Sequence, residues 1–271
     1  MNTESLMKHA KNIRKNIIKQ VSNAKSGHPG GSLGAADILT VLYFNVMDIT
    51  KENAHSLDRD RFVLSKGHAS PLLYAVLAEK GIIPEEELMT FRKMNSRLQG
   101  HPDMNEIDGI DMTTGSLGQG LSASVGMALA NRLEKNSHRI YCLIGDGEAE
   151  EGQIWEAAMA AGHYKLDNLC AVIDENGLQI DGKTSDIVSP APFEDKFRAF
   201  GWNVLSIDGH DYEQIYDAFM KAKKMKGKPT CIVAKTIKGK GVSYMENEAG
   251  WHGKAPDAEL TEVALRDLEG N

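Results

Sequence analysis

The chain has 271 residues and a formal net charge of −7, and its only cluster of basic residues is a lysine run between 221 and 228 that is typical of a solvated helix end. A chain of this length buries roughly 75% of its unfolded surface, so it needs neither disulfides nor a metal to hold a core. Three single cysteines in apolar runs, no signal peptide and no membrane-length apolar run predict a soluble cytoplasmic protein that binds neither nucleic acid nor membrane.

The first half of the chain alternates helical patterns with loops. Apolar residues at helical spacing predict an amphipathic helix over residues 4–22. The following stretch, 26–32, is too rich in glycine and proline for regular structure. The remaining elements expected in this half are a helix over 35–46, a strand over 61–64, a helix from about 70 to 80 and a short helix over 85–93.

The second half alternates strands with helices. A helix that opens near Gly120 ends near Lys135, and apolar runs then predict strands over 141–144, 169–173, 202–207 and 230–235. Helical patterns that begin near 151, 193 and 211 separate these strands, as in a parallel sheet with right-handed crossovers. We therefore expect one α/β domain over 1–271, built as an open, mainly parallel sheet with helices on both faces and ending in a helical tail from about 257.

Polar residues follow two of these strands. Gly145-Asp146-Gly147 ends the strand at 141–144, and Asn176 follows the strand at 169–173. The carboxyl ends of parallel strands face the same crevice, where ligands bind. One carboxylate, one carboxamide and nearby carbonyl groups suit Mg²⁺ or Ca²⁺, and Mg²⁺ usually completes its shell with phosphates. A GDG sequence by itself, however, favours only a tight turn.

Four of the nine histidines lie in loops rich in glycine and proline: His28, His68, His101 and His252. A histidine in such a loop is often only a turn residue. Four of them could also form a zinc site, but none shows the short ligand spacing of a zinc helix or knuckle. Near-neutral imidazoles suit proton exchange with hydroxyl groups, and as N–H donors they suit phosphate oxygens.

Motifs spread over essentially the whole chain resemble those of the transketolase family of thiamine-diphosphate enzymes, in the family's order: SGHPGGSLGAADIL, KGHAS, GHPD, TGSLGQG, GDGEAEEG…ENGLQIDG and WHGKAP. The resemblance implies the thiamine-diphosphate-binding fold of the PP type. It also implies that Asp146, Asn176 and the Leu178 carbonyl ligate the metal of the cofactor, Mg²⁺ with Ca²⁺ or Mn²⁺ as alternatives. Gly147 would offer its N–H to the diphosphate.

The same resemblance assigns a wider set of residues to the cofactor. These are His68, Gly115, Ser116, Leu117, Gly147, Glu151, Asn176, Ile180 and His252. His68 and His252 would contact the diphosphate, while Leu117 and Ile180 would flank the cofactor rings. Ser116 departs from the family, which usually has proline there, and this loses loop rigidity but no chemical group.

Catalytic roles would fall to His28, His101, Glu151 and His252. His28 and His101 stand in loops of their own and, like their family counterparts, would face the donor sugar. Glu151, together with Glu156, would join a carboxylate network near a twofold interface and share protons within it. The simpler interpretation of these acids is that carboxylates favour the start of a helix.

Family members that work alone are more than twice as long, and their second domain binds the aminopyrimidine ring and supplies the glutamate that activates the cofactor. The resemblance therefore implies the amino-terminal subunit of a split transketolase, active only with a C-terminal subunit that carries the pyrimidine-binding domain, in a heterotetramer (alpha2beta2). It would transfer a two-carbon ketol unit between sugar phosphates of the pentose phosphate pathway, by default from xylulose 5-phosphate to ribose 5-phosphate. Ser122, Gly126 and Ala130 give one helix a smooth face, which would be either densely packed inside or part of a subunit interface.

Two other functions remain open. The alpha subunit of a 2-oxo-acid dehydrogenase shares the GDG arrangement but lacks the set SGHPG, KGHAS, GHPD and WHG. A non-catalytic thiamine-diphosphate-binding or regulatory module would be expected to have lost metal ligands or histidines, and this chain keeps them all.

Overall fold

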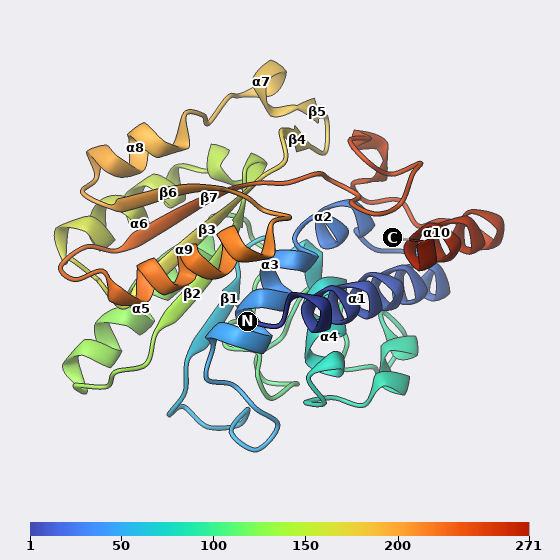
Figure 1. The fold of residues 1–271 in the computed structure, drawn as a ribbon, viewed down its shortest axis with the longest axis horizontal. Coiled ribbons are helices and arrows are strands. Elements are labelled where there is room, and N and C mark those ends of the chain that lie inside the picture. Colours follow the sequence, from blue (N-terminus) through green and yellow to red (C-terminus); the bar gives the residue numbers. More distant parts are fainter. Residues whose placement is uncertain (271) are drawn as a thin grey trace.

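The computed structural model describes residues 1–270 and contains a five-stranded parallel sheet (Figure 1). The strands lie in the order β1-β2-β3-β7-β6, and every neighbouring pair is parallel. Their bounds are Arg61–Leu64 (β1), Ile140–Gly145 (β2), Leu169–Glu175 (β3), Asn203–Asp208 (β6) and Thr230–Lys235 (β7). The predicted parallel α/β architecture is therefore confirmed.

Successive residues along a strand point to opposite faces of the sheet and join different hydrophobic clusters. In β2, Tyr141 and Leu143 belong to one cluster, whereas Cys142 and Ile144 belong to the other. All four are at most 1% exposed. A strand that is buried on both faces has no polar side to show, which is why its sequence is a continuous apolar run.

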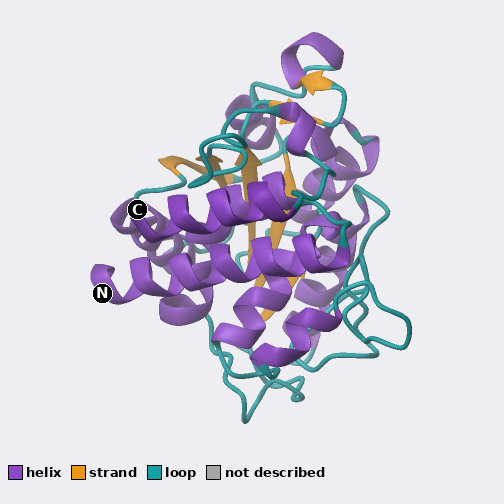
Figure 2. Cartoon of the chain, turned by 90° about the vertical axis from the view of Figure 1, so that its right-hand side faces the viewer, coloured by secondary structure: helices purple, strands orange, loops and turns teal. Residues whose placement is uncertain are grey.

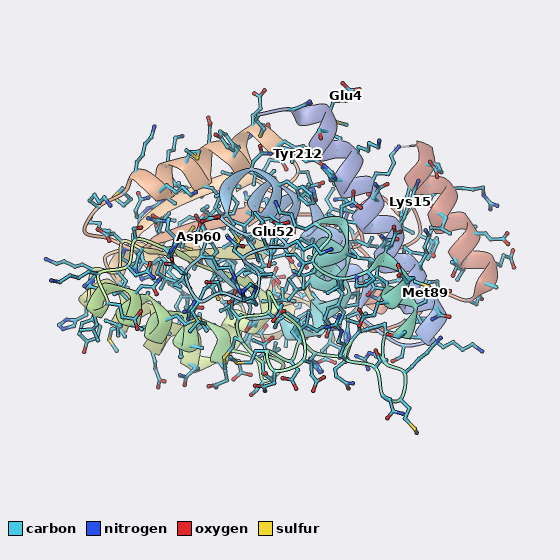
Figure 3. The ribbon with its side chains drawn as sticks, turned by 90° about the horizontal axis from the view of Figure 1, so that it is seen from below. Glu4, Lys15, Glu52, Asp60, Met89 and Tyr212 are labelled. Carbon is cyan, nitrogen blue, oxygen red and sulfur yellow. The ribbon has the colours of Figure 1, made fainter. Side chains whose placement is uncertain are left out.

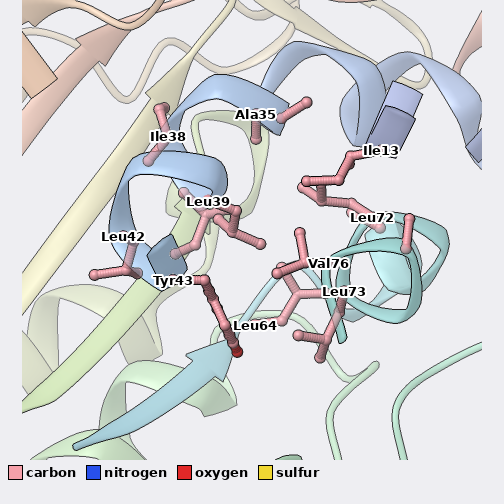
Figure 4. Close-up of a cluster of buried hydrophobic side chains, with 14 of the residues drawn as sticks. Ile13, Ala35, Ile38, Leu39, Leu42, Tyr43, Leu64, Leu72, Leu73 and Val76 are labelled. Atoms are coloured by element: carbon pink, nitrogen blue, oxygen red, sulfur yellow. The ribbon is translucent and has the colours of Figure 1, made fainter. Parts of the chain in front are cut away.

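One face of the sheet is covered by four helices: α1 (Thr3–Ala24), α3 (Ala36–Val41), α4 (Ser70–Glu79) and α9 (Tyr212–Lys224). Figure 4 shows part of this cluster, where Ile13 of α1, Leu39 of α3 and Val76 of α4 converge with Leu64 of β1. Each such side chain contributes roughly 1.5–3 kcal/mol when it is fully buried. The apolar stripe of α1, which is evident in the sequence, is thus the stripe that faces the core.

The other face is covered by α5 (Gln119–Leu133), α6 (Gly152–His163) and α8 (Phe193–Ala199), so that helices enclose the strands (Figure 2). The crossover from β2 to β3 runs through α6 on this face. The crossover from β6 to β7 moves across the sheet in the opposite direction and runs through α9 on the other face. Right-handed crossovers require this change of face when the direction reverses.

The glycine-rich stretch after α1 differs from the expectation of irregular structure, because α2 spans Pro29–Gly34. Proline suits the first position of a helix, where its missing N–H has no partner to lose. The glycines also let other backbone segments come close. A Cβ added to Gly30 or Gly34 would come within 3.0 Å of the carbonyl oxygen of Trp251 or Ile237, respectively.

The remaining elements are short, apart from the last helix. They are a π-helix (η1, Leu42–Val46), the 3-10 helices η2 (Gly67–Ala69), η3 (Glu85–Thr90), η4 (Gly147–Glu150) and η5 (Ala249–Trp251), the hairpin strands β4 (Leu178–Gln179) and β5 (Gly182–Lys183), α7 (Thr184–Ile187) and α10 (Ala258–Gly270). The helix predicted over 35–46 is therefore divided into α3 and η1, and the short helix predicted over 85–93 is a 3-10 helix. Figure 1 shows α10 lying along α1, where the Thr261 hydroxyl contacts the Ser22 hydroxyl at 2.7 Å.

The smooth face of α5 is turned away from the core. Gly126 and Ala130 are exposed, Ser122 is half-buried, and a Cβ added to Gly126 would meet nothing within 4 Å. Dense internal packing of this face is therefore wrong for the described chain. Within residues 1–270, no helix combines the length and the apolarity needed to cross a membrane.

Candidate active site

The carboxyl ends of β2 and β3 border a cavity of about 310 Å³. The strand register places Gly145 beside Asp174 and Asp174 beside Ala234, so the residues that follow β2, β3 and β7 face one another. Most of the predicted metal and cofactor residues line this cavity: His68, Leu117, Asp146, Gly147, Glu151, Asn176, Leu178, Ile180 and His252. The other predicted residues lie outside its lining: His28, His101, Gly115 and Ser116.

Asp146 is held by backbone N–H groups in the turn after β2. Its Oδ1 accepts from the Gly147 N–H at 2.8 Å, and its Oδ2 accepts from the N–H groups of Asn176 and Gly177 at 2.9 and 2.6 Å. Burial, and then the neighbouring Asp174 carboxylate, raises the pKa of Asp146 to about 6. Burial and a second carboxylate both destabilise the ionised form of Asp146. A cation bound nearby would stabilise that form, as is expected for a metal ligand.

Asn176 and Leu178 complete the oxygen set predicted for a metal. Asn176 Oδ1 accepts from the Leu178 N–H at 3.1 Å, and the Leu178 carbonyl accepts from Lys238 Nζ at 3.2 Å. Burial, followed by the nearby Lys66 ammonium, lowers the pKa of Lys238 to about 8. A cationic side chain therefore already lies against the carbonyl that was predicted to ligate a metal.

A buried ion pair that was not among the predicted site residues lies beside this set. Lys66 Nζ contacts Asp174 Oδ2 at 2.5 Å and donates to the Gly31 carbonyl at 2.9 Å, and both charged residues are at most 2% exposed. Burial opposes ionisation of Asp174, but the Lys66 ammonium and the Thr236 hydroxyl hold the pKa of Asp174 below its usual value. The signal in the sequence was the position of both residues at strand ends, Lys66 shortly after β1 and Asp174 within the end of β3.

Glu148 joins three segments around the cavity. Its Oε1 accepts from the Ser65 hydroxyl at 2.5 Å and from the Gly118 N–H at 2.9 Å, and its Oε2 accepts from the Gly145 N–H at 3.0 Å. Burial raises the pKa of Glu148, which is only 3% exposed. Sequence reasoning missed this residue because it lies in an acidic run in which nothing indicates which carboxylate points inward.

Three of the predicted histidines come together from distant parts of the chain. The ring centroids of His28, His68 and His252 lie 5.0, 5.2 and 5.4 Å apart in pairs. Burial is the main cause that lowers the pKa of His28 to about 4 and that of His252 to about 3, and it holds the pKa of His68 well below its usual value. Neutral imidazoles can each donate one N–H to an anionic oxygen, and the buried Nδ1 atoms of His28 and His252 have no partner among the described residues.

His101 stands in a loop of its own. A Cβ added to Gly115 would come within 3.0 Å of the His101 ring, and position 115 has a φ of +144°. Both features explain why this position is a glycine. Burial, and then the Arg92 guanidinium, lowers the pKa of His101. Ser116 is exposed, as is Glu151.

The donor set of the cavity fits a metal ion and a diphosphate. The Asp146 carboxylate, the Asn176 carboxamide and the Leu178 carbonyl are hard oxygen ligands for a metal. Lys238 supplies a positive charge for phosphate oxygens, and the neutral histidines supply N–H donors for them. Within residues 1–270, no three His, Cys, Asp or Glu side chains are grouped so that they could hold a metal ion. Three histidines do converge, but together with the other described residues they form no such group.

The fold and this cavity define an α/β protein with a polar ligand site at the carboxyl edge of a parallel sheet. The chain belongs to the family described as "Transketolase, thiamine diphosphate binding domain", whose model matches residues 6–268. This match confirms the family resemblance and favours transketolase over a 2-oxo-acid dehydrogenase.

Similar proteins fall into two groups by length. The 6-deoxy-6-sulfo-D-fructose transketolase subunit SqwG of Clostridium sp. (strain MSTE9) is 49% identical over 264 residues, which are 97% of this chain and 96% of that protein. A subunit of the apulose-4-phosphate transketolase of Phocaeicola vulgatus is 44% identical over 268 residues, 99% of this chain and 95% of that protein. The transketolase structure from Campylobacter jejuni superposes with a TM-score of 0.92 at 38% identity, over 99% of this chain but only 43% of that chain. The chain thus matches nearly the full length of these two subunits and less than half of the Campylobacter jejuni transketolase.

Proposed function

We propose that this chain is the amino-terminal subunit of a split transketolase and that it holds the metal–diphosphate part of thiamine diphosphate. The observation that carries this proposal is the convergence of Asp146, Asn176 and the Leu178 carbonyl with His68 and His252 on one cavity. The metal would be Mg²⁺, since hard oxygen ligands and phosphates suit it, with Ca²⁺ or Mn²⁺ as alternatives. When bound, thiamine diphosphate supplies the electron sink that lets a carbon–carbon bond beside a carbonyl break and form.

The residues of this chain would bind and orient the reactants. Asp146, Asn176 and the Leu178 carbonyl would hold the metal, and His68 would donate an N–H to the diphosphate. The Gly147 N–H donates to Asp146 and would have to exchange that bond for one to the diphosphate.

His28 and His101 would accept and return protons at the hydroxyl groups of the donor sugar. Burial holds the pKa of His28 near 4, so its imidazole is neutral at neutral pH and has one nitrogen free to accept a proton. His252 would serve both the diphosphate and the sugar, because its ring lies 5.4 Å from that of His28.

A second polypeptide would complete the enzyme, in a heterotetramer with two copies of each chain. Two relatives of matching length are named as subunits, which supports such a partner. This chain leaves suitable surface for it: Glu151 and Glu156 are exposed, and so are Gly126 and Ala130 of α5. Glu151 and Glu156 would join the partner's carboxylates near the twofold axis.

The substrates would be a ketose and an aldose that carry a terminal anionic group. The relatives are named for 6-deoxy-6-sulfo-D-fructose and apulose 4-phosphate, so a sulfonate and a phosphate are both represented among them. Xylulose 5-phosphate as donor and ribose 5-phosphate as acceptor are therefore one pair in the panel to be tested, alongside 6-deoxy-6-sulfo-D-fructose and apulose 4-phosphate as donors.

The proposal is tested by reconstitution. The chain is purified alone and together with a candidate C-terminal chain from the same genome that carries a pyrimidine-type domain, and each sample receives Mg²⁺, thiamine diphosphate and the substrate panel. We expect ketol transfer, followed by mass spectrometry of the product sugars, only in the combined sample. Robust turnover by the chain alone would contradict the split-subunit proposal. A stable complex that neither binds thiamine diphosphate nor transfers a ketol unit would refute the function itself.

A further inference from the structure

A buried carboxylate outside the cofactor cavity connects three helices. Asp37 of α3 is 3% exposed and receives the Arg14 guanidinium through two hydrogen bonds of 2.9 and 2.7 Å. The Tyr212 hydroxyl donates to Asp37 at 2.6 Å, and His210 Nδ1 lies 2.8 Å from it. Figure 3 shows Tyr212 where α9 begins, beside the amino-terminal half of α1. Four side-chain contacts thus converge on one carboxylate.

His210 connects Asp37 to the backbone beside the cavity. The Ile237 N–H donates to His210 Nε2 at 2.9 Å. A nitrogen that accepts from an N–H carries no proton, so the ring proton lies on Nδ1 and is donated to Asp37. The imidazole is therefore fixed at both nitrogens, with Asp37 on one side and the backbone of Ile237 on the other.

The segment 236–241 that begins here forms part of the cavity wall. Lys238 lines the cavity and donates to the Leu178 carbonyl, and the Gly239 N–H donates to the Gly30 carbonyl at 2.9 Å. The Thr236 hydroxyl donates to Asp174. The path of this backbone consequently decides where the Lys238 ammonium lies.

We propose that Asp37 and His210 are positioning residues, which hold the backbone at Ile237 and thereby place the Lys238 ammonium at the cofactor cavity. Neither Asp37 nor His210 lines the cavity, so each acts through the segment 236–241. Binding groups work only when the residues behind them hold their geometry to a fraction of an ångström. This inference rests on the proposed function, because it takes the cavity to be the diphosphate site.

The test compares two histidines that both contact an aspartate. His210→Ala removes both hydrogen bonds, and His210→Gln restores an acceptor for the Ile237 N–H. His138→Ala is the matched control, since His138 Nε2 lies 2.7 Å from Asp58 Oδ1. His138 precedes β2 and therefore lies at the amino ends of the strands, whereas the cavity lies at their carboxyl ends. Hydrogen–deuterium exchange is measured on segment 236–241 in the free chain, and thiamine diphosphate affinity is measured by calorimetry with Mg²⁺ in the assembled enzyme.

We expect His210→Ala to speed exchange in segment 236–241 and to weaken cofactor binding about tenfold, the loss of one hydrogen-bonded contact to a charged group. His210→Gln should recover part of both effects, and His138→Ala should show neither. In a Lys238→Met background, His210→Ala should weaken the cofactor no further, because residues that act through one another are not additive.

Equal weakening in the wild-type and Lys238→Met backgrounds would overturn the proposal. A lowered Tm for His210→Ala, with unchanged exchange in segment 236–241 and unchanged cofactor affinity, would also overturn the proposal. The contacts of Asp37 and His210 would then stabilise the fold by joining helices without positioning Lys238. If the wild-type enzyme itself fails to bind thiamine diphosphate, the proposed function is refuted, and the exchange data still decide whether His210 fixes the segment.

Discussion

Replacing Glu148 with glutamine tests whether one buried carboxylate fixes the segments around the cavity. The exchange keeps the shape of the side chain, and its remaining oxygen can still accept from the Ser65 hydroxyl and the Gly118 N–H. The new amide group cannot accept from the Gly145 N–H, because two donors would face each other where the bond now measures 3.0 Å. The change therefore removes one hydrogen bond and leaves a backbone donor unsatisfied.

The expected loss follows from these contacts. A hydrogen bond to a charged acceptor is worth about 1.5–3 kcal/mol. Burial raises the pKa of Glu148, so removing its charge returns part of the desolvation energy, and the loss should fall near the lower end, about 2 kcal/mol. For a chain of this size that corresponds to a decrease in Tm of roughly 4 °C.

Urea unfolding of the free chain, followed by circular dichroism, measures this loss. Glu150→Gln is the control, because Glu150 lies two residues further on, is half-buried, and within residues 1–270 accepts only from Gln179 Nε2 at 3.3 Å. We expect Glu148→Gln to lower the free energy of unfolding and Glu150→Gln to leave it within about 0.5 kcal/mol of wild type. A Glu148→Gln variant as stable as wild type would refute the assignment of Glu148 as the residue that joins these segments.

Other predictions concern the metal, the sugar and pH. Asp146→Ala should weaken thiamine diphosphate about tenfold or more in the assembled enzyme, since each hydrogen bond to a charged group is worth about 1.5–3 kcal/mol; unchanged affinity and unchanged Mg²⁺ dependence in calorimetry would exclude Asp146 as a ligand. His101→Ala should raise the donor KM or lower kcat at nearly unchanged cofactor affinity; a variant that loses cofactor but keeps wild-type kinetics at saturating cofactor would contradict a role at the sugar. Burial lowers the pKa of His28 from 6.5 to about 4, so the unfolded chain binds more protons in that window and the free energy of unfolding should fall as pH is lowered through it. His28→Asn should flatten this fall in urea titrations at successive pH values, and superimposable profiles would show that His28 does not contribute.

The sheet and the turn at its edge could be predicted from local sequence. Apolar runs such as 141–144 and 169–173 are continuous because both faces of each strand are buried, and a strand of this kind needs no tertiary information to be recognised. Asp146 and Asn176 follow two such strands, and parallel strands bring their carboxyl ends to one edge. This rule predicts that Asp146 and Asn176 border the same cavity, and both residues do line it.

Spacing along the chain could not show which charged residues are paired inside the protein. Lys66 and Asp174 form a buried ion pair although they lie 108 positions apart, and Glu148 accepts hydrogen bonds from Ser65 and Gly118, which belong to distant segments of the chain. These contacts depend on which strands become neighbours. Because the chain inserts β7 between β3 and β6, the strand order is a property of the whole sheet and not of any segment.

The histidines show the same division. Local sequence placed His28, His68 and His252 in glycine-rich loops, and the family resemblance suggested their roles. Only the folded chain brings their rings to within 5.0–5.4 Å of one another, and only there does burial lower their pKa values and keep the imidazoles neutral. Desolvation arises from atoms contributed by distant segments, so a protonation state is decided by tertiary packing and cannot be deduced from the residue's neighbours in sequence.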